Sequence, residues 1–293
     1  MTQRLTPHPA HIRHFSSAEQ VAQGLAGVKY LSDSATAQAT FLADALAKPL
    51  LLEGPAGTGK TQLALSVAEL TNSRLIRLQC YQGIDEARAL YEWDYRKQLL
   101  AIQRSDDNGL SNVFSEEFLL SRPLLVAVRS EEPVVLLIDE VDQLDVEAEA
   151  LLLEFLSSYQ VSVPELGTVR ALRTPLVFLT SNNNRELSEA LRRRCLFLHV
   201  DYPSPERERE IIAARVPGLS DEITGRISDT VAALRGMDLK KSPSVSETLD
   251  WAQTLSLLGA PEITDELVIG HANILLKHQA DIDLLRGELA PSS

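Results

Sequence analysis

The chain has 293 residues, of which 44% are hydrophobic and 24% are charged. This balance is that of an ordinary globular protein, and the length suits one large domain or two small ones. The longest apolar runs, such as Val134–Ile138, have the length of a strand and are too short to cross a membrane. The first residues lack the apolar core of a signal peptide, so we expect a cytoplasmic protein. The net charge of −13 repels phosphate backbones and argues against general nucleic-acid binding.

Five short apolar segments predict the strands of a parallel sheet. Their nearly continuous apolarity is typical of strands that are covered on both faces. They are Leu50–Leu52, Leu75–Leu78, Val134–Ile138, Leu176–Leu179 and Leu196–Val200. Helical patterns separate them, and the clearest repeats apolar residues at spacings of three and four from Leu144 to Tyr159. This alternation predicts a doubly wound α/β core.

The strand pattern stops after Asp201-Tyr202-Pro203, and helix-start signals follow. Ser204 with Pro205 is typical of a helix N-terminus, and Ser244 with Glu247 has the spacing of a capping box. We therefore expect an N-terminal tail and helix over residues 1–27, an α/β core over 28–203 and an all-helical domain over 204–293.

A phosphate-binding loop is predicted between the first strand and the helix that follows it. The motif reads Gly54-Pro55-Ala56-Gly57-Thr58-Gly59-Lys60-Thr61. Its glycines let the backbone curl, so that N–H groups and the helix N-terminus face the phosphates. Lys60 can reach the β- and γ-phosphates of ATP, and the Thr61 hydroxyl can ligate Mg²⁺. The alternative is a glycine-rich turn without nucleotide.

Two carboxylates follow the apolar run Val134–Ile138, at the strand end where ligands of open α/β sheets bind. Asp139 fits the role associated with Mg²⁺, and Glu140 fits the base that orients and deprotonates the attacking water. A glutamate directly after the aspartate favours hydrolysis over phosphoryl transfer to a metabolite. The alternative is a solvated acidic turn, which is our interpretation of Asp142 and Asp145.

Polar residues beside the two later strands complete the candidate site. Asn182 follows Leu176–Leu179, a strand that we expect between those of the loop and of Asp139, and could polarise the water. The alternative is an asparagine-rich turn. The run Arg192–Arg194 precedes the last strand. Its charges could simply lie at a helix C-terminus, where the helix dipole favours positive side chains. One of these arginines could instead reach the γ-phosphate held by a neighbouring subunit; we prefer Arg194, then Arg193.

These elements in this order, followed by a helical domain, resemble an AAA+ ATPase and, more narrowly, the MoxR family. Glu53-Gly54-Pro55 and the stretch from Leu191 to Pro203 are similar to that family's pattern. Three further stretches resemble its CoxD-like branch, which is accessory to carbon monoxide dehydrogenase. They are Leu78–Glu86, Leu90–Asp94 and Val163–Gly167.

The resemblance implies a five-stranded AAA+ P-loop NTPase core with a helix insertion at about 81–123, a hairpin at about 160–170 and a small helical lid. It implies ATP hydrolysis with Mg²⁺ in a hexameric ring that binds nucleotide between subunits. It also implies a partner with a von Willebrand A domain, and maturation of a metalloenzyme client, here a molybdenum hydroxylase such as carbon monoxide dehydrogenase. The alternatives are another metalloenzyme client, a nucleic-acid motor, or a nucleotide-gated scaffold.

Two features leave alternatives open. AAA+ lids commonly carry an arginine near the start of their third helix, whereas this chain has serine at the aligned positions. Either Lys240 or Lys241 substitutes for it, or both lysines are solvated. The aromatic residues Tyr91, Trp93 and Tyr95 are either a docking cluster for a partner or the apolar face of the insertion.

Overall fold

The computed structural model describes residues 11–104, 114–164 and 166–289. The chain divides into two compact units, which are described separately. The first comprises the N-terminal part up to Val28, Ser32–Glu53 and Thr61–His199. The second comprises Lys29–Leu31, Gly54–Lys60 and the chain from Val200 onward. In the described ranges no helix is both long and apolar enough to cross a membrane.

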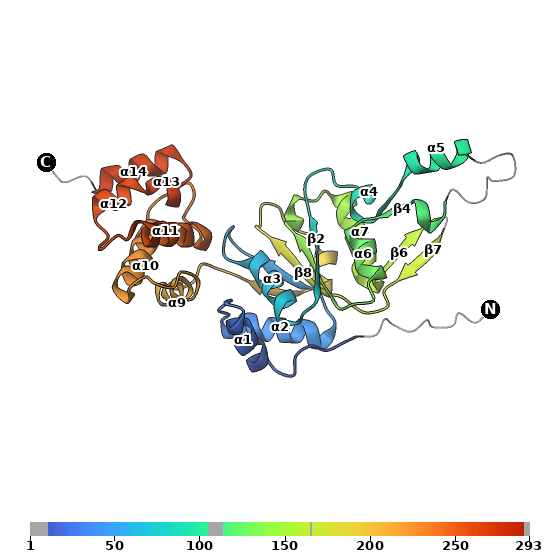
Figure 1. Cartoon of the computed structure of the whole chain (residues 1–293), viewed down its shortest axis with the longest axis horizontal. Coiled ribbons are helices and arrows are strands. Elements are labelled where there is room, and N and C mark those ends of the chain that lie inside the picture. The colour runs from blue at the N-terminus through green and yellow to red at the C-terminus, as the bar shows by residue number, and fades with distance from the viewer. Residues whose placement is uncertain (1–10, 105–113, 165, 290–293) are drawn as a thin grey trace. The chain divides into compact units, whose positions relative to one another are not determined.

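The first unit is built on a five-stranded parallel sheet in the order β2-β5-β8-β1-β9 (Figure 1), which confirms the predicted fold class. The strands are β1 Leu50–Glu53, β2 Arg74–Gln79, β5 Val134–Asp139, β8 Leu176–Ser181 and β9 Leu196–His199. Every residue of β1, β5 and β8 is buried, as their continuous apolarity predicted. Because β8 lies between β5 and β1, the polar residues that follow these three strands gather at one edge of the sheet.

Helices and a hairpin complete the first unit. On one face of the sheet, Leu136 and Leu179 share a core with Leu125 and Phe155 of two covering helices. The neighbouring residues Leu137 and Phe178 are also buried and, by strand alternation, point to the opposite face. Outside the interval between β2 and α6, the α-helices of the unit are α1 Ala18–Gly27, α2 Ser34–Leu46, α3 Lys60–Leu70, α6 Pro123–Arg129, α7 Val146–Ser158 and α8 Glu189–Arg194. The antiparallel hairpin of β6 Gln160–Val163 and β7 Gly167–Arg170 follows α7.

The interval between β2 and α6 contains more than helices. Helices α4 Glu86–Ala89 and α5 Tyr95–Arg104 accompany a two-stranded antiparallel ribbon. The ribbon pairs β3 Tyr91–Trp93 with β4 Leu119–Ser121 and was not predicted.

The aromatic residues of this interval differ in their exposure to solvent. Trp93 is only 8% exposed, belongs to the main core and packs edge-on against Phe114, with ring centroids 5.3 Å apart. Tyr95, in contrast, is 61% exposed. Reading the three aromatics as one docking cluster is therefore wrong for Trp93, because a buried ring stabilises the fold and is not accessible to a partner.

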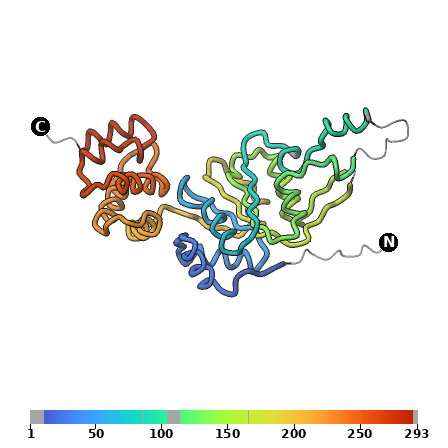
Figure 2. Tube along the Cα trace, in the orientation of Figure 1, coloured from blue at the N-terminus to red at the C-terminus, as the bar shows by residue number. Residues whose placement is uncertain are grey.

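The second unit contains a helical bundle with its own core around Trp251, which is fully buried. Its helices are α9 Pro205–Arg215, α10 Asp221–Arg235, α11 Val245–Leu258, α12 Asp265–Gly270, α13 Ala272–Leu275 and α14 Gln279–Leu289. The predicted capping box of α11 is confirmed: the Ser244 hydroxyl accepts the Glu247 N–H, and the Glu247 carboxylate accepts the Ser244 N–H. The tube in Figure 2 follows the same helices along the chain.

Candidate active site

The predicted phosphate-binding loop, Gly54–Lys60, joins β1 to α3. Gly57 and Gly59 have φ angles of 76° and 91°, a left-handed region that side chains with a Cβ rarely adopt. The Lys60 ammonium donates to the carbonyl oxygens of Gly54 at 2.8 Å and Pro55 at 2.6 Å. Thr58 donates from its hydroxyl to the same Pro55 oxygen at 3.1 Å. The loop therefore curls around a positive charge, an arrangement that suits phosphate binding.

The two residues predicted to hold Mg²⁺ lie together. The Thr61 hydroxyl, in the first turn of α3, donates to Oδ1 of Asp139 at 3.0 Å. Asp139 ends β5 and is only 2% exposed. Hydroxyl and carboxylate oxygens are the hard ligands that Mg²⁺ prefers, so this pair fits the ion.

Thr180 is a site residue that the sequence analysis missed. Its buried hydroxyl donates to Oδ1 of Asp139 at 2.5 Å and accepts the backbone N–H of Glu140 at 2.9 Å. Glu140 has φ 60° and ψ 50°, a left-handed conformation that is costly for a residue other than glycine. The hydrogen bond to Thr180 holds the backbone in this conformation and so fixes the position from which the Glu140 side chain extends.

Two residues of β2 hold the carboxylates from the other side, and they were also missed. Arg77 donates from Nη2 to Oδ2 of Asp139 and to Oε1 of Gln79, both at 2.5 Å. Gln79 donates from Nε2 to Oε2 of Glu140 at 3.0 Å. The register explains this arrangement, because Gln79 pairs directly with Asp139 across the sheet.

The asparagine-rich segment after β8 is organised by Asp142. We expected Asp142 in a solvated turn, and this was wrong: it is 4% exposed and accepts bonds from the backbone N–H and side-chain amide of Asn184. Asp145 remains exposed and caps the N-terminus of α7. The Asn182 side chain makes no hydrogen bond with the described residues, which leaves its amide available to a ligand.

A buried carboxylate on α7 fastens the loop between β8 and α8. Glu149 accepts the Ser188 N–H at 2.9 Å and pairs with Arg185 at 2.9 Å. Burial raises the pKa of the Glu149 carboxyl, but the bonds from Ser188 and Arg185 outweigh burial and hold the pKa below its usual range. The carboxylate is therefore ionised where it lies.

The three arginines of α8 have different partners. Arg192 pairs with Glu53 at 2.8 Å, and Arg193 pairs with Glu189 on its own helix at 2.8 Å. Arg194 is exposed and donates to the Ser157 hydroxyl at 2.9 Å. Among the side chains that the structure describes, Arg194 pairs with no carboxylate. Of the two predicted candidates, Arg193 has its charge neutralised by Glu189, whereas the charge of Arg194 is not neutralised by a described carboxylate.

The lysines of the second unit sit on a fixed turn. The backbone N–H groups of Lys240 and Lys241 donate to the buried Asp281 carboxylate at 2.9 and 3.3 Å. Both side chains are exposed. The fixed backbone is compatible with either alternative, a solvated pair or a substitute for the missing arginine.

The surroundings of the two cysteines make their thiols unreactive. Burial, together with the nearby carboxylates of Asp139, Asp142 and Glu140, raises the pKa of the Cys80 thiol to about 12. Burial raises the pKa of Cys195 to about 12 as well, although this residue is only partly buried. Neither thiol carries a thiolate at neutral pH, so neither suits nucleophilic chemistry.

Comparison with known proteins identifies the family. A model of the AAA domain, dynein-related subfamily, matches residues 49–195, which span every strand of the sheet except the last. The 26S proteasome regulatory subunit 8 homolog of Schizosaccharomyces pombe is 25% identical over 225 residues, which are 72% of this chain and 44% of that protein. The chain thus spans less than half the length of this relative.

Solved structures with a similar fold include a RuvB mutant of Thermotoga maritima, with a TM-score of 0.51 and 17% identity over 92% of this chain and 74% of that one. A second RuvB mutant from the same organism has a TM-score of 0.50 and 17% identity over 88% of this chain and 70% of that one. At this identity the likeness concerns the fold alone. Because the family model covers half of the sequence, the chain belongs to the AAA domain family, in its dynein-related subfamily.

Proposed function

We propose that the chain is an ATP-hydrolysing motor in which Glu140 is the general base. The observation that carries this proposal is the cluster of Thr61, Asp139, Thr180 and Glu140, joined by hydrogen bonds of 2.5 to 3.0 Å at the carboxyl ends of β5 and β8. These residues follow directly on the phosphate-binding loop or end the neighbouring strands. A buried carboxylate for a metal beside a partly exposed carboxylate for a water is the set of groups that ATP hydrolysis requires.

Each residue has a distinct part in the proposed reaction. Lys60 leaves the carbonyls of its own loop and neutralises the β- and γ-phosphates. Thr61 and Asp139 would hold Mg²⁺, which would supply further positive charge to the phosphate oxygens. Glu140 accepts a proton from the attacking water, and the free amide of Asn182 orients that water or the γ-phosphate.

The proposal is tested by two substitutions and a matched control. Lys60→Ala should lose most of its affinity for ATP, because the loop loses its point charge. Glu140→Gln should bind ATP normally but lose turnover by about a hundredfold or more, because the amide keeps the shape but accepts no proton. Glu147→Gln removes the same charge from the exposed start of α7 and should leave the steady-state rate unchanged. Turnover by Glu140→Gln at the wild-type rate would refute the base assignment.

We also propose that the active form is a ring, specifically a hexamer, in which Arg194 completes the neighbouring site. The exposure of Arg194 and its lack of a described carboxylate partner support this, because an arginine that acts on another subunit must be free of strong pairing in its own. Arg193 is the second candidate and is bound to Glu189. Molecular mass in solution, measured with and without ATP, tests the assembly.

The finer proposal is a MoxR-type chaperone of the CoxD-like branch. In this role the motor acts with a von Willebrand A-domain partner in the cytoplasm to complete the metal centre of a molybdenum hydroxylase. The resemblance of the stretches named above supports it. A strain that lacks this chain should contain the hydroxylase folded and assembled but inactive, with an incomplete metal-sulfur centre. A complete and active centre in that strain, measured by metal analysis, would refute the maturation role and leave the ATPase proposal intact.

A further inference from the structure

The phosphate-binding loop is hydrogen-bonded to the start of α11, and both belong to the second unit. The backbone N–H of Val245, the first residue of α11, donates to the carbonyl oxygen of Gly57 at 3.2 Å. The first N–H groups of a helix have no acceptor within the helix and need one elsewhere. The loop supplies that acceptor, so the bond satisfies a helix N–H and fixes a loop carbonyl at the same time.

Ser244, the N-cap residue of α11, lies against the same point of the loop. A Cβ added at Gly57 would lie 2.2 Å from the Cβ and 2.4 Å from the hydroxyl oxygen of Ser244, distances that no real side chain tolerates. Ser244 is itself buried, and the Glu247 carboxylate accepts its N–H at 2.9 Å. The start of α11 is therefore a rigid support for the loop, and Gly57 must be glycine for the helix to come this close.

The bond from Val245 sets the direction of the next N–H group in the loop. The Gly57 carbonyl and the Thr58 N–H belong to one planar trans peptide group, in which C=O and N–H point in opposite directions. Because the carbonyl is held toward α11, the Thr58 N–H points away from α11. The chain turns here so that this N–H faces the Pro55 oxygen, which also accepts the Lys60 ammonium at 2.6 Å. The Thr58 N–H and the Lys60 charge thus face the same side of the loop.

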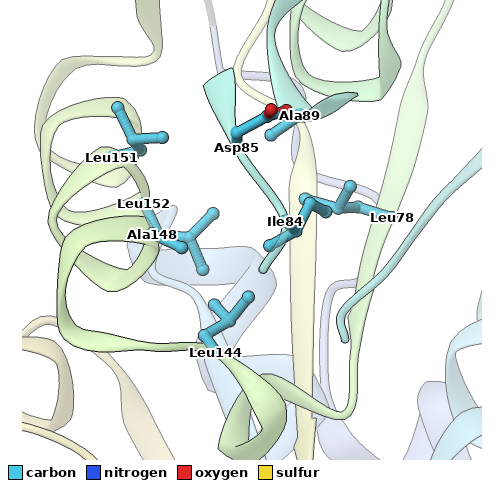
Figure 3. A pocket seen from close by; sticks show the side chains of 8 residues that line it. All are labelled: Leu78, Ile84, Asp85, Ala89, Leu144, Ala148, Leu151 and Leu152. Carbon is cyan, nitrogen blue, oxygen red and sulfur yellow. The ribbon is translucent and has the colours of Figure 1, made fainter. Parts of the chain in front are cut away.

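Packing holds the strand ends of the site, whereas hydrogen bonds hold the loop. Behind β2, the gap between Ile84 and the leucines of α7 measures about 10 Å³, which is room for one water at most (Figure 3). The core around this gap leaves the strand ends little freedom. The loop Gly54–Lys60 is rich in glycine and has little apolar surface to pack. Its conformation therefore depends on the bonds that its carbonyls accept, and the bond from Val245 is one of these.

We propose that Val245 is a positioning residue of the nucleotide site: its N–H holds the Gly57–Thr58 peptide group so that the Thr58 N–H faces the phosphates of ATP. The inference rests on the proposed function, because it requires that the loop binds ATP. Without this bond the peptide group is free to rotate, since glycine adopts φ angles of either sign. A rotated group would present a carbonyl oxygen to the phosphates in place of an N–H, and binding would weaken. Helix α11 thus contributes to phosphate binding through the backbone of the loop.

Val245→Pro tests this role because it removes the N–H and disturbs the helix little. Proline is favoured at the first residue of a helix, and the chain already begins α9 with Ser204-Pro205. Ser244 has φ −84° and ψ 171°, an extended conformation that a following proline accepts. The KM for ATP should rise about fivefold, the equivalent of one hydrogen bond, while kcat and Tm stay near their wild-type values. The Kd for a fluorescent ADP analogue should rise by the same factor.

Two further variants separate the lost N–H from other effects of the substitution. Val245→Ala is the conservative variant: it shortens the side chain but restores the N–H, and it should restore the affinity. Asp265→Pro places a proline at the first residue of α12, from which no described bond reaches the loop, and should leave the Kd unchanged. A folded Val245→Pro chain with the wild-type Kd for the ADP analogue would overturn the inference.

A measurement on the wild-type chain decides the matter even if the proline variant does not fold. The Val245 N–H should exchange with deuterium more slowly than the N–H groups of Asp221 and Asp265, which begin α10 and α12 and have no acceptor among the described residues. Exchange is followed by NMR and corrected for the intrinsic rate of each sequence. Equally fast exchange at all three positions would overturn the inference. A wild-type chain that binds neither ADP nor ATP would refute the proposed function instead.

Discussion

Thr180 offers the sharpest test of how the site is held together. Replacing it with valine keeps the shape of the side chain and removes its hydroxyl. The Asp139 carboxylate then loses a buried donor, and the Glu140 N–H loses its acceptor. A hydrogen bond to a charged group contributes about 1.5–3 kcal/mol, and an unsatisfied buried N–H costs about 1–3 kcal/mol. Because Glu140 is partly exposed, water satisfies some of this loss, and we expect a decrease of about 3 kcal/mol in the free energy of unfolding.

For a unit of this size, that decrease corresponds to a fall in Tm of about 6–12 °C, measured by circular dichroism. The ATPase rate should fall about tenfold or more, since Glu140 would no longer be anchored in its left-handed conformation. Thr180→Ser keeps the hydroxyl and should retain most of the rate, with a loss of only about 1 kcal/mol for the missing methyl group. If the valine and serine variants had equal Tm and equal rates, the hydroxyl would not be holding these carboxylates, and the reasoning would be refuted.

Three further predictions follow from the contacts described. Arg194→Ala should bind ATP but hydrolyse it poorly, and mixing it with Lys60→Ala subunits should restore part of the rate; verified mixed rings without any rescue would count against action on a neighbour. With a thiol pKa of about 12, Cys80 should react with iodoacetamide about a thousandfold more slowly in the folded chain than in urea at pH 8, as mass spectrometry of the labelled peptide would show. Glu149→Gln should lower the unfolding free energy by about 1–2 kcal/mol at pH 7. Because the folded pKa of Glu149 is lowered, its contribution is present above pH 4.5 and is lost as pH falls through the folded value. The difference from wild type should therefore narrow in acid, and a difference that grew there would contradict the assigned ionisation.

The sheet and the loop could be predicted because their signals are local. A run such as Val134–Ile138 is apolar throughout, as a strand buried on both faces must be. The spacing of glycines before Lys60 likewise lies within one short stretch of sequence. The ribbon of β3 and β4 escaped prediction because each strand has three residues, too few to show a period.

The remaining site residues come from the register of the sheet and from distant contacts. Gln79 and Thr180 reach Glu140 from neighbouring strands that are 61 and 40 residues away in sequence. Asp142 looked solvated because its partner Asn184 is 42 residues distant. Such partners follow from the pairing of strands β2, β5 and β8, which no short stretch of sequence encodes.

The attachment of the loop between β8 and α8 to α7 has a consequence for the order in which neighbouring ATP sites would react. The loop begins beside Asn182, which faces the chain's own nucleotide in the proposed mechanism, and it leads to Arg194, which would serve the next one. Glu149 fixes the second half of this loop to α7 through its bonds with Arg185 and Ser188. The segment between Asn182 and Arg194 therefore has little freedom to move independently of α7. A movement of Asn182 at one ATP site would therefore move Arg194, which would contact the ATP of the next subunit. In the proposed ring, subunits coupled in this way would hydrolyse ATP one after another, and loosening the contacts of Glu149 would make the order of hydrolysis random.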